Sequence, residues 1–120
     1  NLRHYDEWKE TDLVETMTYF LDAVMEDFII KLEAMRDSDD QEKRLAFSFM
    51  ERAYRFAKEN RALGLGVLGY HSLLQAKGFP FESVDAGKLN IEIFKFIREK
   101  AESASVAMAR EYGEPEVLKG

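Results

Sequence analysis

Apolar residues recur at helical spacing along most of this chain. Between residues 11 and 35 they fall into two rows, each with neighbours three, four or seven positions apart, which is typical of an α-helix and not of a strand. The first row is Leu13, Met17, Phe20, Val24 and Phe28, and the second is Val14, Leu21, Met25, Leu32 and Met35. Two rows predict a helix with a wide apolar face.

A second helix is predicted immediately afterwards. The polar run at residues 36–40 breaks the pattern, and Asp39 followed three positions later by Glu42 predicts a capping pair for a helix that runs to about Asn60. Small residues form one stripe of this helix, and larger apolar residues widen the surface that we expect to be buried: Ala46, Met50, Ala53 and Ala57, then Leu45, Phe47, Phe49, Tyr54 and Phe56. We expect the two helices to form an antiparallel hairpin.

Three glycines then interrupt the helical pattern. Gly64, Gly66 and Gly69 lie close together, and each interior glycine costs a helix about 1 kcal/mol relative to alanine. We therefore expect a turn or a short strand at residues 63–67. A short helix is predicted over residues 68–76, and it should end at Gly78, which Pro80 follows.

The longest remaining pattern begins after Ser83, which we predict as its N-cap, and runs to about Tyr112. Its apolar face consists of Leu89, Ile93, Ile97, Ala101, Ala104 and Met108. Gly113 and Pro115 should end it. Residues 1–10, with two aromatic side chains among charged ones, are expected to pack down as an irregular arm. The sequence thus predicts a mainly all-α fold, with residues 1–120 forming one domain, a bundle of about four helices.

Composition narrows the possible classes of function. The chain has 120 residues, 46% of them hydrophobic, and a net charge of −6. An acidic surface disfavours nucleic acid, whose phosphates demand a basic face. The chain has no cysteine, so disulfides and thiolate metal sites are excluded. No apolar stretch approaches ~18 residues, and the first residues do not read as a signal peptide, so we expect no membrane partner and a cytoplasmic location.

One motif suggests nucleotide binding. Residues 64–69 satisfy G-x-G-x-x-G, and Glu82 and Asp85 follow at roughly the distance of a ribose ligand in a dinucleotide fold. That fold needs a buried strand before the turn and a parallel strand after the helix, whereas both flanks here have helical patterns. We therefore predict no cofactor here, and a nucleotide at residues 64–69 is the weaker alternative.

Other candidate groups do not assemble into a site in the sequence. His71 is a candidate general base, but it lacks a nucleophile or an orienting carboxylate at definable spacing, so a packing or surface role is favoured. A di-iron site needs Glu-x-x-His motifs, which neither His4 nor His71 completes. The acidic residues of the first helix favour a solvated face or pairing with Lys and Arg of a neighbour: Glu15, Asp22, Glu26 and Asp27. No catalytic, cofactor-binding or metal residue is predicted.

The glycine region also carries a family signature. It comprises Asn60-Arg61-x-x-Gly64-Leu65-Gly66-Val67-x-Gly69, then Leu73-Leu74, then Phe79-Pro80-Phe81-Glu82-Ser83. In order and spacing this stretch resembles an internal part of the large (α) subunit of class I ribonucleotide reductases. Residues 20–24 and 113–120 are similar to flanking segments of that family. The resemblance implies an inner piece of a ten-stranded α/β barrel, in which the glycine segment is a strand.

The activity implied by the resemblance is reduction of ribonucleoside diphosphates, which supplies deoxyribonucleotides for DNA replication. The family uses a thiyl radical on one cysteine, two further cysteines, an asparagine and a glutamate. This chain has no cysteine, and the family's catalytic and phosphate-binding loops would lie before Asn1 and after Gly120. No catalytic residue can therefore be carried over, and the enzymatic activity of the chain alone stays open.

Two hypotheses follow. The chain is either a structural segment of a reductase large subunit, active only with the other segments, or a free-standing helical interaction module without activity. Wide apolar helix faces that nothing else covers become association sites. We therefore expect a homo-oligomer, most simply a dimer, with other reductase segments as the alternative partners.

Overall fold

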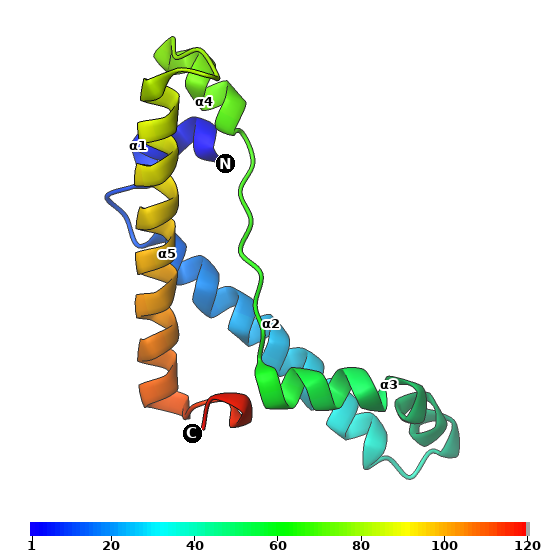
Figure 1. Ribbon diagram of the computed structural model, residues 1–120. Helices are drawn as coiled ribbons and strands as arrows, with labels where there is room; N and C mark the ends of the chain where they lie inside the picture. The colour runs from blue at the N-terminus through cyan, green and yellow to red at the C-terminus, as the bar shows by residue number, and fades with distance from the viewer. Residues whose placement is uncertain (120) are drawn as a thin grey trace. The chain divides into compact units, whose positions relative to one another are not determined.

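The computed structural model describes residues 1–119, and Gly120, the last residue of the predicted domain, lies outside them. Five α-helices and two short 3-10 turns account for most of these residues, and no strand occurs among them (Figure 1). The helices are α1 (Tyr5–Trp8), α2 (Leu13–Arg36), α3 (Gln41–Asn60), α4 (Tyr70–Lys77) and α5 (Val84–Tyr112), and the turns are η1 (Leu2–His4) and η2 (Glu116–Leu118). The prediction of a mainly all-α fold is confirmed.

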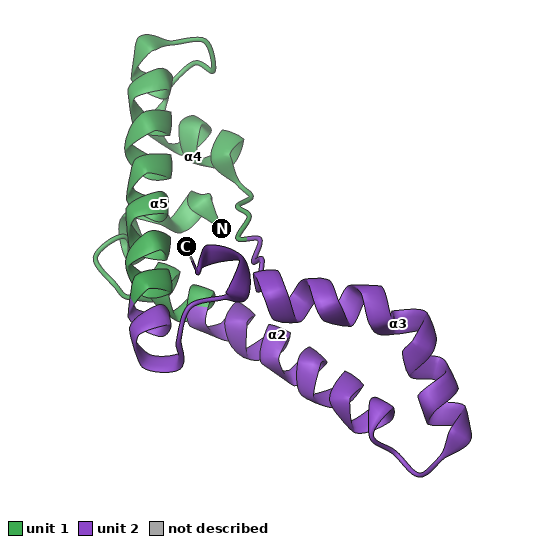
Figure 2. Cartoon of the chain, turned by 60° about the horizontal axis from the view of Figure 1, so that its bottom comes forward, with its two compact units in different colours: residues 1–18, 65–106 green, residues 19–64, 107–120 purple. Residues whose placement is uncertain are grey.

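The chain divides into two compact units (Figure 2). Unit 1 consists of residues 1–18 and 65–106, and unit 2 of residues 19–64 and 107–120. Each unit therefore combines segments that are far apart in the sequence.

One face of α5 forms the core of unit 1. Ile93 is completely buried, and Leu89 and Ile97 are nearly so, as the apolar spacing predicted. They form one cluster with residues from the start of the chain, from α2 and from α4: Leu2, Tyr5, Val14, Leu73, Leu74 and Ala86. Apolar side chains that are removed from water in this way supply most of the free energy that favours folding.

The N-terminal segment is helical, so the expectation of an irregular arm was wrong. The side chain of Asn1 accepts a hydrogen bond from the Arg3 amide at 3.0 Å and caps the first turn. The Leu2 amide donates to the Leu68 carbonyl at 2.7 Å, which ties the turn to the chain before α4. These local and tertiary hydrogen bonds satisfy backbone groups that a short helix cannot satisfy alone.

Glycine fixes both ends of α4. Gly69 lies in the left-handed region with φ of 83°, and this conformation starts α4 at Tyr70, two residues after the predicted start. A Cβ at Gly69 would lie 2.1 Å from Asn1 Oδ1, so the N-terminal residue fills the space beside it. Gly78, also left-handed, ends α4 where the sequence predicted. Ser83 caps α5 as predicted, because its Oγ accepts from the Ala86 amide at 3.1 Å.

Unit 2 contains the predicted antiparallel hairpin of α2 and α3 (Figure 2). Ile29 and Leu32 of α2 and Ala57 of α3 are buried. The Tyr54 hydroxyl donates to Glu33 Oε1 at 2.8 Å, and Lys58 Nζ donates to the same oxygen at 2.5 Å. The hairpin is therefore joined by a few buried apolar side chains and by a polar network at its side.

The cap of α3 is Asp40, not Asp39. Asp40 has the extended backbone of an N-cap residue, and its Oδ1 accepts from the Glu42 amide at 2.9 Å. The capping-pair prediction placed the cap three residues before Glu42, but the helix begins directly after Asp40. The Ser38 hydroxyl accepts from the Asp40 amide at 3.1 Å and shapes the turn before the helix.

Much of the apolar surface expected to be buried in the first two helices is exposed. On α3, Leu45, Phe49 and Phe56 are 60%, 81% and 60% exposed, and they lie within about 40° of one another at about 100° per residue. Tyr54, which contacts α2, lies roughly 160° around the helix from this stripe. On α2, Phe20 and Val24 of the first predicted row are more than half exposed. The hairpin covers only one face of each helix.

The glycine segment leaves α3 without regular structure. Residues 61–69 belong to no helix or strand, and their path is extended (Figure 1). The expected turn or short strand at residues 63–67 is therefore absent from the described chain. A strand is defined by hydrogen bonds to a neighbouring strand, and the described residues supply none.

Among the described helices, none is both long and apolar enough to cross a membrane.

Replacing Gly69 by alanine should lower the free energy of unfolding by about 1–2 kcal/mol, because an L residue is strained at positive φ and its Cβ displaces the Asn1 side chain. Gly66→Ala is the matched control, since its Cβ would meet no atom within 4 Å. Urea titration of both variants measures the difference. Equal stabilities would contradict the role assigned to Gly69.

Removing the cap of α3 with Asp40→Ala should cost about 1 kcal/mol, the usual cost of losing a capping carboxylate. Asp39→Ala removes the same charge from the adjacent position and should leave stability nearly unchanged. Thermal unfolding followed by circular dichroism compares the two. A larger loss for Asp39→Ala would show that the cap lies where the sequence pattern placed it.

Candidate functional site

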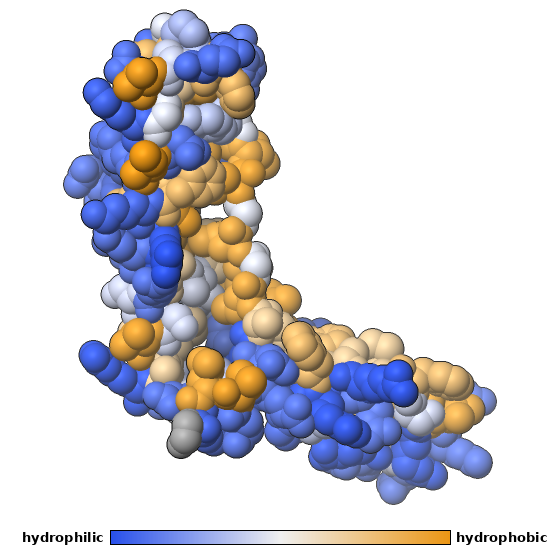
Figure 3. Space-filling view, viewed as in Figure 1, coloured by the Kyte–Doolittle hydropathy of each residue, from blue (hydrophilic) through white to orange (hydrophobic). Residues whose placement is uncertain are grey.

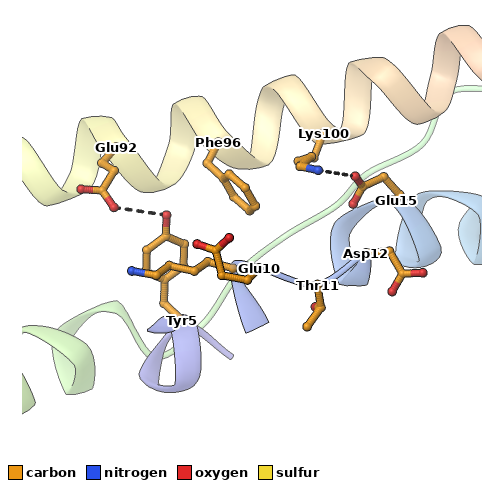
Figure 4. Close-up of a pocket in the computed structure, with 9 residues that line it drawn as sticks. Tyr5, Glu10, Thr11, Asp12, Glu15, Glu92, Phe96 and Lys100 are labelled. Carbon is orange, nitrogen blue, oxygen red and sulfur yellow. Dashed lines mark hydrogen bonds and ion pairs between the residues drawn. The ribbon is translucent and has the colours of Figure 1, made fainter. Parts of the chain in front are cut away.

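Unit 1 contains an open cleft. Its volume is about 570 Å³, and polar and aromatic side chains from the N-terminal segment, α2 and α5 line it (Figure 4). The lining residues are Tyr5, Lys9, Glu10, Thr11, Asp12, Glu15, Glu92, Phe96 and Lys100. The cleft lies where the N-terminal segment approaches α5.

Two polar contacts join the walls of this cleft. Lys100 Nζ lies 2.7 Å from Glu15 Oε1, and the Tyr5 hydroxyl donates to Glu92 Oε1 at 3.4 Å (Figure 4). The Lys100 ammonium also lies 5.8 Å from the centre of the Phe96 ring, a favourable cation–π arrangement. Both contacts link segments that are far apart in the sequence.

The pKa shifts of Glu15 and Tyr5 in the cleft favour a structural role over acid–base catalysis. The hydrogen bond from Lys100 lowers the pKa of Glu15, so this carboxylate is ionised at neutral pH. Burial raises the pKa of Tyr5, and the neighbouring Glu92 raises it further, so the phenol keeps its proton. A general acid or base works best with a pKa near the working pH, and these shifts move both groups away from it.

A smaller hollow of about 330 Å³ lies beside the first and has the same character. Asp6 there accepts from Lys77 at 2.6 Å and from Lys9 at 3.0 Å. The hydrogen bonds from Lys77 and then Lys9 lower the pKa of Asp6. This pairing ties α1 to the end of α4.

Unit 2 contains an arginine held by two carboxylates. Arg61 Nε and Nη2 donate to the two carboxylate oxygens of Asp22 at 3.1 and 3.0 Å, and Nη1 donates to Glu26 Oε2 at 2.5 Å. Burial by itself lowers the pKa of Arg61, but the hydrogen bonds to Glu26 and Asp22 outweigh it and the pKa is raised. Asp22 and Glu26 of the predicted acidic row thus pair with a basic residue of a neighbouring segment, one of the two roles expected for them, whereas Asp27 pairs with Lys31 of its own helix.

Sequence reasoning did not find the side-chain role of Arg61. The residue appeared only as a letter of the family signature. Its position was nevertheless a signal, because the residue after a helix end is commonly glycine, and an arginine there needs another explanation. Its partners could not be read from the sequence, since Asp22 and Glu26 lie on α2, 39 and 35 residues earlier in the chain.

The structure does not bring the other candidate groups into a site. His71 is exposed on α4, with its ring 6.4 Å from that of Phe81. Glu82 and Asp85, the proposed ribose ligands, are exposed, and α3 rather than a strand precedes the glycines. The space beside Gly69, where a phosphate would approach the turn, holds the Asn1 side chain. The geometry therefore does not support the nucleotide alternative.

Metal ligands are also dispersed. Among residues 1–119, no group of three or more His, Asp or Glu side chains is close enough to hold a metal ion. Five acidic residues described above are instead paired with Lys or Arg: Asp6, Glu15, Asp22, Glu26 and Glu33. These ion pairs hold segments of the chain against one another.

Comparison with known proteins connects this geometry to a family. The sequence model of "Ribonucleotide reductase, barrel domain" matches residues 2–118. The ribonucleoside-diphosphate reductase large subunit of Invertebrate iridescent virus 6 is 38% identical over 121 residues, which cover 100% of this chain and 11% of the relative. A putative large subunit of Frog virus 3 is also 38% identical, over all of this chain and 19% of its own length.

A solved structure agrees with these matches. The Actinobacillus ureae class Id ribonucleotide reductase α subunit superposes on the whole of this chain with a TM-score of 0.83 and 48% sequence identity, covering 21% of that subunit. The chain thus spans between 11% and 21% of the length of these relatives. The resemblance carried by the glycine region is confirmed, and the chain belongs to the ribonucleotide reductase barrel domain family.

Proposed function

We propose that this chain is a structural segment of a ribonucleoside-diphosphate reductase large subunit and is not catalytic by itself. It would help to build the barrel in which ribonucleoside diphosphates are reduced to deoxyribonucleotides, the precursors for DNA replication. Two facts support this proposal. The large-subunit relatives match the chain along its full length while being several times longer, and the chain has no cysteine for the family's radical and disulfide chemistry.

The match of much longer large subunits along the whole chain carries the proposal, and an uncovered apolar stripe on α3 is consistent with it. Leu45, Phe49 and Phe56 are at least 60% exposed on one face of the helix, and Figure 3 shows apolar residues gathered along α3. Full burial of one such side chain is worth about 1.5–3 kcal/mol. A contiguous exposed apolar surface commonly marks an association site, and the remaining length of a large subunit would supply the surface that covers this stripe.

The extended glycine segment supports the same conclusion. Residues 62–67 make no described backbone hydrogen bonds to one another or to other elements, so these backbone groups can pair with a neighbouring strand. Exposed or half-exposed apolar side chains stand between the glycines: Leu63, Leu65 and Val67. We propose that this segment becomes a barrel strand when neighbouring strands of the large subunit pair with it.

The alternative function is a free-standing homo-oligomer, most simply a dimer, without enzymatic activity. The same exposed stripe of α3 favours it, because a second copy would bury that stripe as well as a reductase segment would. The two functions differ in what the chain does with the rest of a large subunit. A free-standing module would assemble from copies of this chain alone. A reductase segment would need the cysteine-bearing parts of the large subunit for activity.

Complementation tests the proposed function. The purified chain alone should show no diphosphate reduction, and activity should appear when the remaining large-subunit segments and the radical-generating small subunit are added. Product deoxyribonucleotides are measured by chromatography, with the same mixture lacking this chain as the control. Absence of activity in the complete mixture, together with a sharp dimer of the chain in light scattering, would favour the free-standing module.

Substitution of Phe49 by glutamine tests the surface. If the stripe is buried in the assembled enzyme, Phe49→Gln should weaken association with the other segments about tenfold or more, since the lost burial is worth at least ~1.4 kcal/mol. Glu51→Gln is the control, because Glu51 points away from the stripe and pairs with Arg55 at 3.1 Å. Titrating the chain into the complementation assay measures both affinities. Equal affinities would mean that the stripe is not part of the interface.

A further inference from the structure

We infer that Arg61 is a positioning residue: its contact with Asp22 and Glu26 fixes the direction in which the glycine segment leaves α3. The inference rests on the proposed function only where that segment is said to serve as a barrel strand. Its structural part stands on the geometry of unit 2 alone. Asp22, Glu26, Arg61 and residues 62–64 all belong to that unit.

The backbone of Arg61 is the first observation. Arg61 has φ of 45° and ψ of 40°, and it is the one residue other than glycine with positive φ among the residues described. Its amide donates to the Ala57 carbonyl at 2.9 Å and closes the last turn of α3. Glycine adopts this conformation without strain, so an arginine here costs conformational free energy that its side chain must offset.

The side chain provides that compensation. Two guanidinium nitrogens meet both oxygens of Asp22, a third meets Glu26, and Nη2 also lies 3.5 Å from the Asp22 carbonyl. Only 24% of the Arg61 side chain and 19% of the Asp22 side chain are exposed, so water screens this pair less than a surface pair. The bidentate geometry restrains orientation as well as distance.

Together these contacts attach Arg61 to both helices of the hairpin. The backbone of Arg61 is fixed to the last turn of α3, and its side chain is fixed to the middle of α2. Residues 62–64 follow directly, without helical or strand hydrogen bonds of their own. Arg61 is therefore the last residue before the glycine segment that the hairpin holds in place. In the assembled subunit it would set where the proposed strand starts.

Distance measurements on the full chain test this role. The sequence has no cysteine, so spin labels can be attached at Ala34→Cys on α2 and Gly64→Cys in the glycine segment. Both positions are exposed, and a Cβ at Gly64 would meet no atom within 4 Å. A second pair, Ala34→Cys and Ala53→Cys, reports on the hairpin itself. Pulsed electron–electron double resonance gives the distribution of distances between the two spin labels of each pair.

The expected result is specific to one pair. Arg61→Lys loses the bidentate contact while keeping the charge, and Arg61→Gly removes the side chain while relieving the backbone. Both should broaden the 34–64 distribution and leave the 34–53 distribution narrow. Arg55→Lys is the matched control, because Arg55 pairs only with Glu51 of its own helix in the described contacts, and it should change neither.

Charge reversal provides a rescue. Arg61→Asp alone should broaden the 34–64 distribution, and the double variant Asp22→Arg with Arg61→Asp should narrow it again, since aspartate tolerates the left-handed region. A broad 34–64 distribution in the unmodified chain would overturn the inference. So would equal broadening of both pairs in Arg61→Lys and Arg61→Gly, because Arg61 would then only stabilise the hairpin.

Activity of the assembled enzyme gives the second readout. With Arg61→Lys, turnover should fall by up to about 100-fold, the effect of a misplaced structural element, while the amount of assembled complex stays the same. Unchanged turnover would overturn the role in placing the strand. If the complex with the unmodified chain is itself inactive, the proposed function fails, whereas the distance measurements still decide whether Arg61 directs the segment.

Discussion

Burial of one face of α5 is the interaction on which unit 1 depends. Ile93 has no exposed surface, and the residues one turn before and after it are nearly buried. They pack in a single cluster with Leu2 and Tyr5 from the start of the sequence and with Leu73 and Leu74 from α4. Segments that would be marginal alone, such as a four-residue helix, become helical because this face gives them an apolar surface to cover.

Unit 2 depends more on polar contacts. The hairpin buries few large side chains, and its helices are joined by Glu33 with Tyr54 and Lys58, and by Arg61 with Asp22 and Glu26. Exposed ion pairs contribute little because water and salt screen them. The pair of Arg61 and Asp22 is partly buried, so water and salt screen it less. The hairpin also leaves a stripe of apolar side chains on α3 exposed.

Membership of the reductase family gives these features a common explanation. The chain matches relatives of which it covers at most about a fifth, and the clefts of unit 1 contain structural ion pairs with pKa values displaced from neutrality. Its charged residues join segments to one another. The glycine segment matches a nucleotide-binding pattern, but the Asn1 side chain fills the space beside Gly69. At its other end the segment follows Arg61, the residue that ends α3.

The sequence by itself determined the helices α2 to α5, most of their ends and the family. Helical spacing, Gly78 and Ser83 are local signals, because propensity and capping depend on neighbours along the chain. The same local rule chose Asp39 over Asp40 as the cap, since a motif of fixed spacing cannot show how the preceding turn is shaped.

Only the tertiary structure decided which apolar row is covered, whether the arm is helical and what Arg61 contacts. Leu32 is buried while Phe20 is exposed on the same helix, although both are large and apolar. Which of them meets another surface depends on residues distant in sequence, and helical periodicity contains no information about those residues.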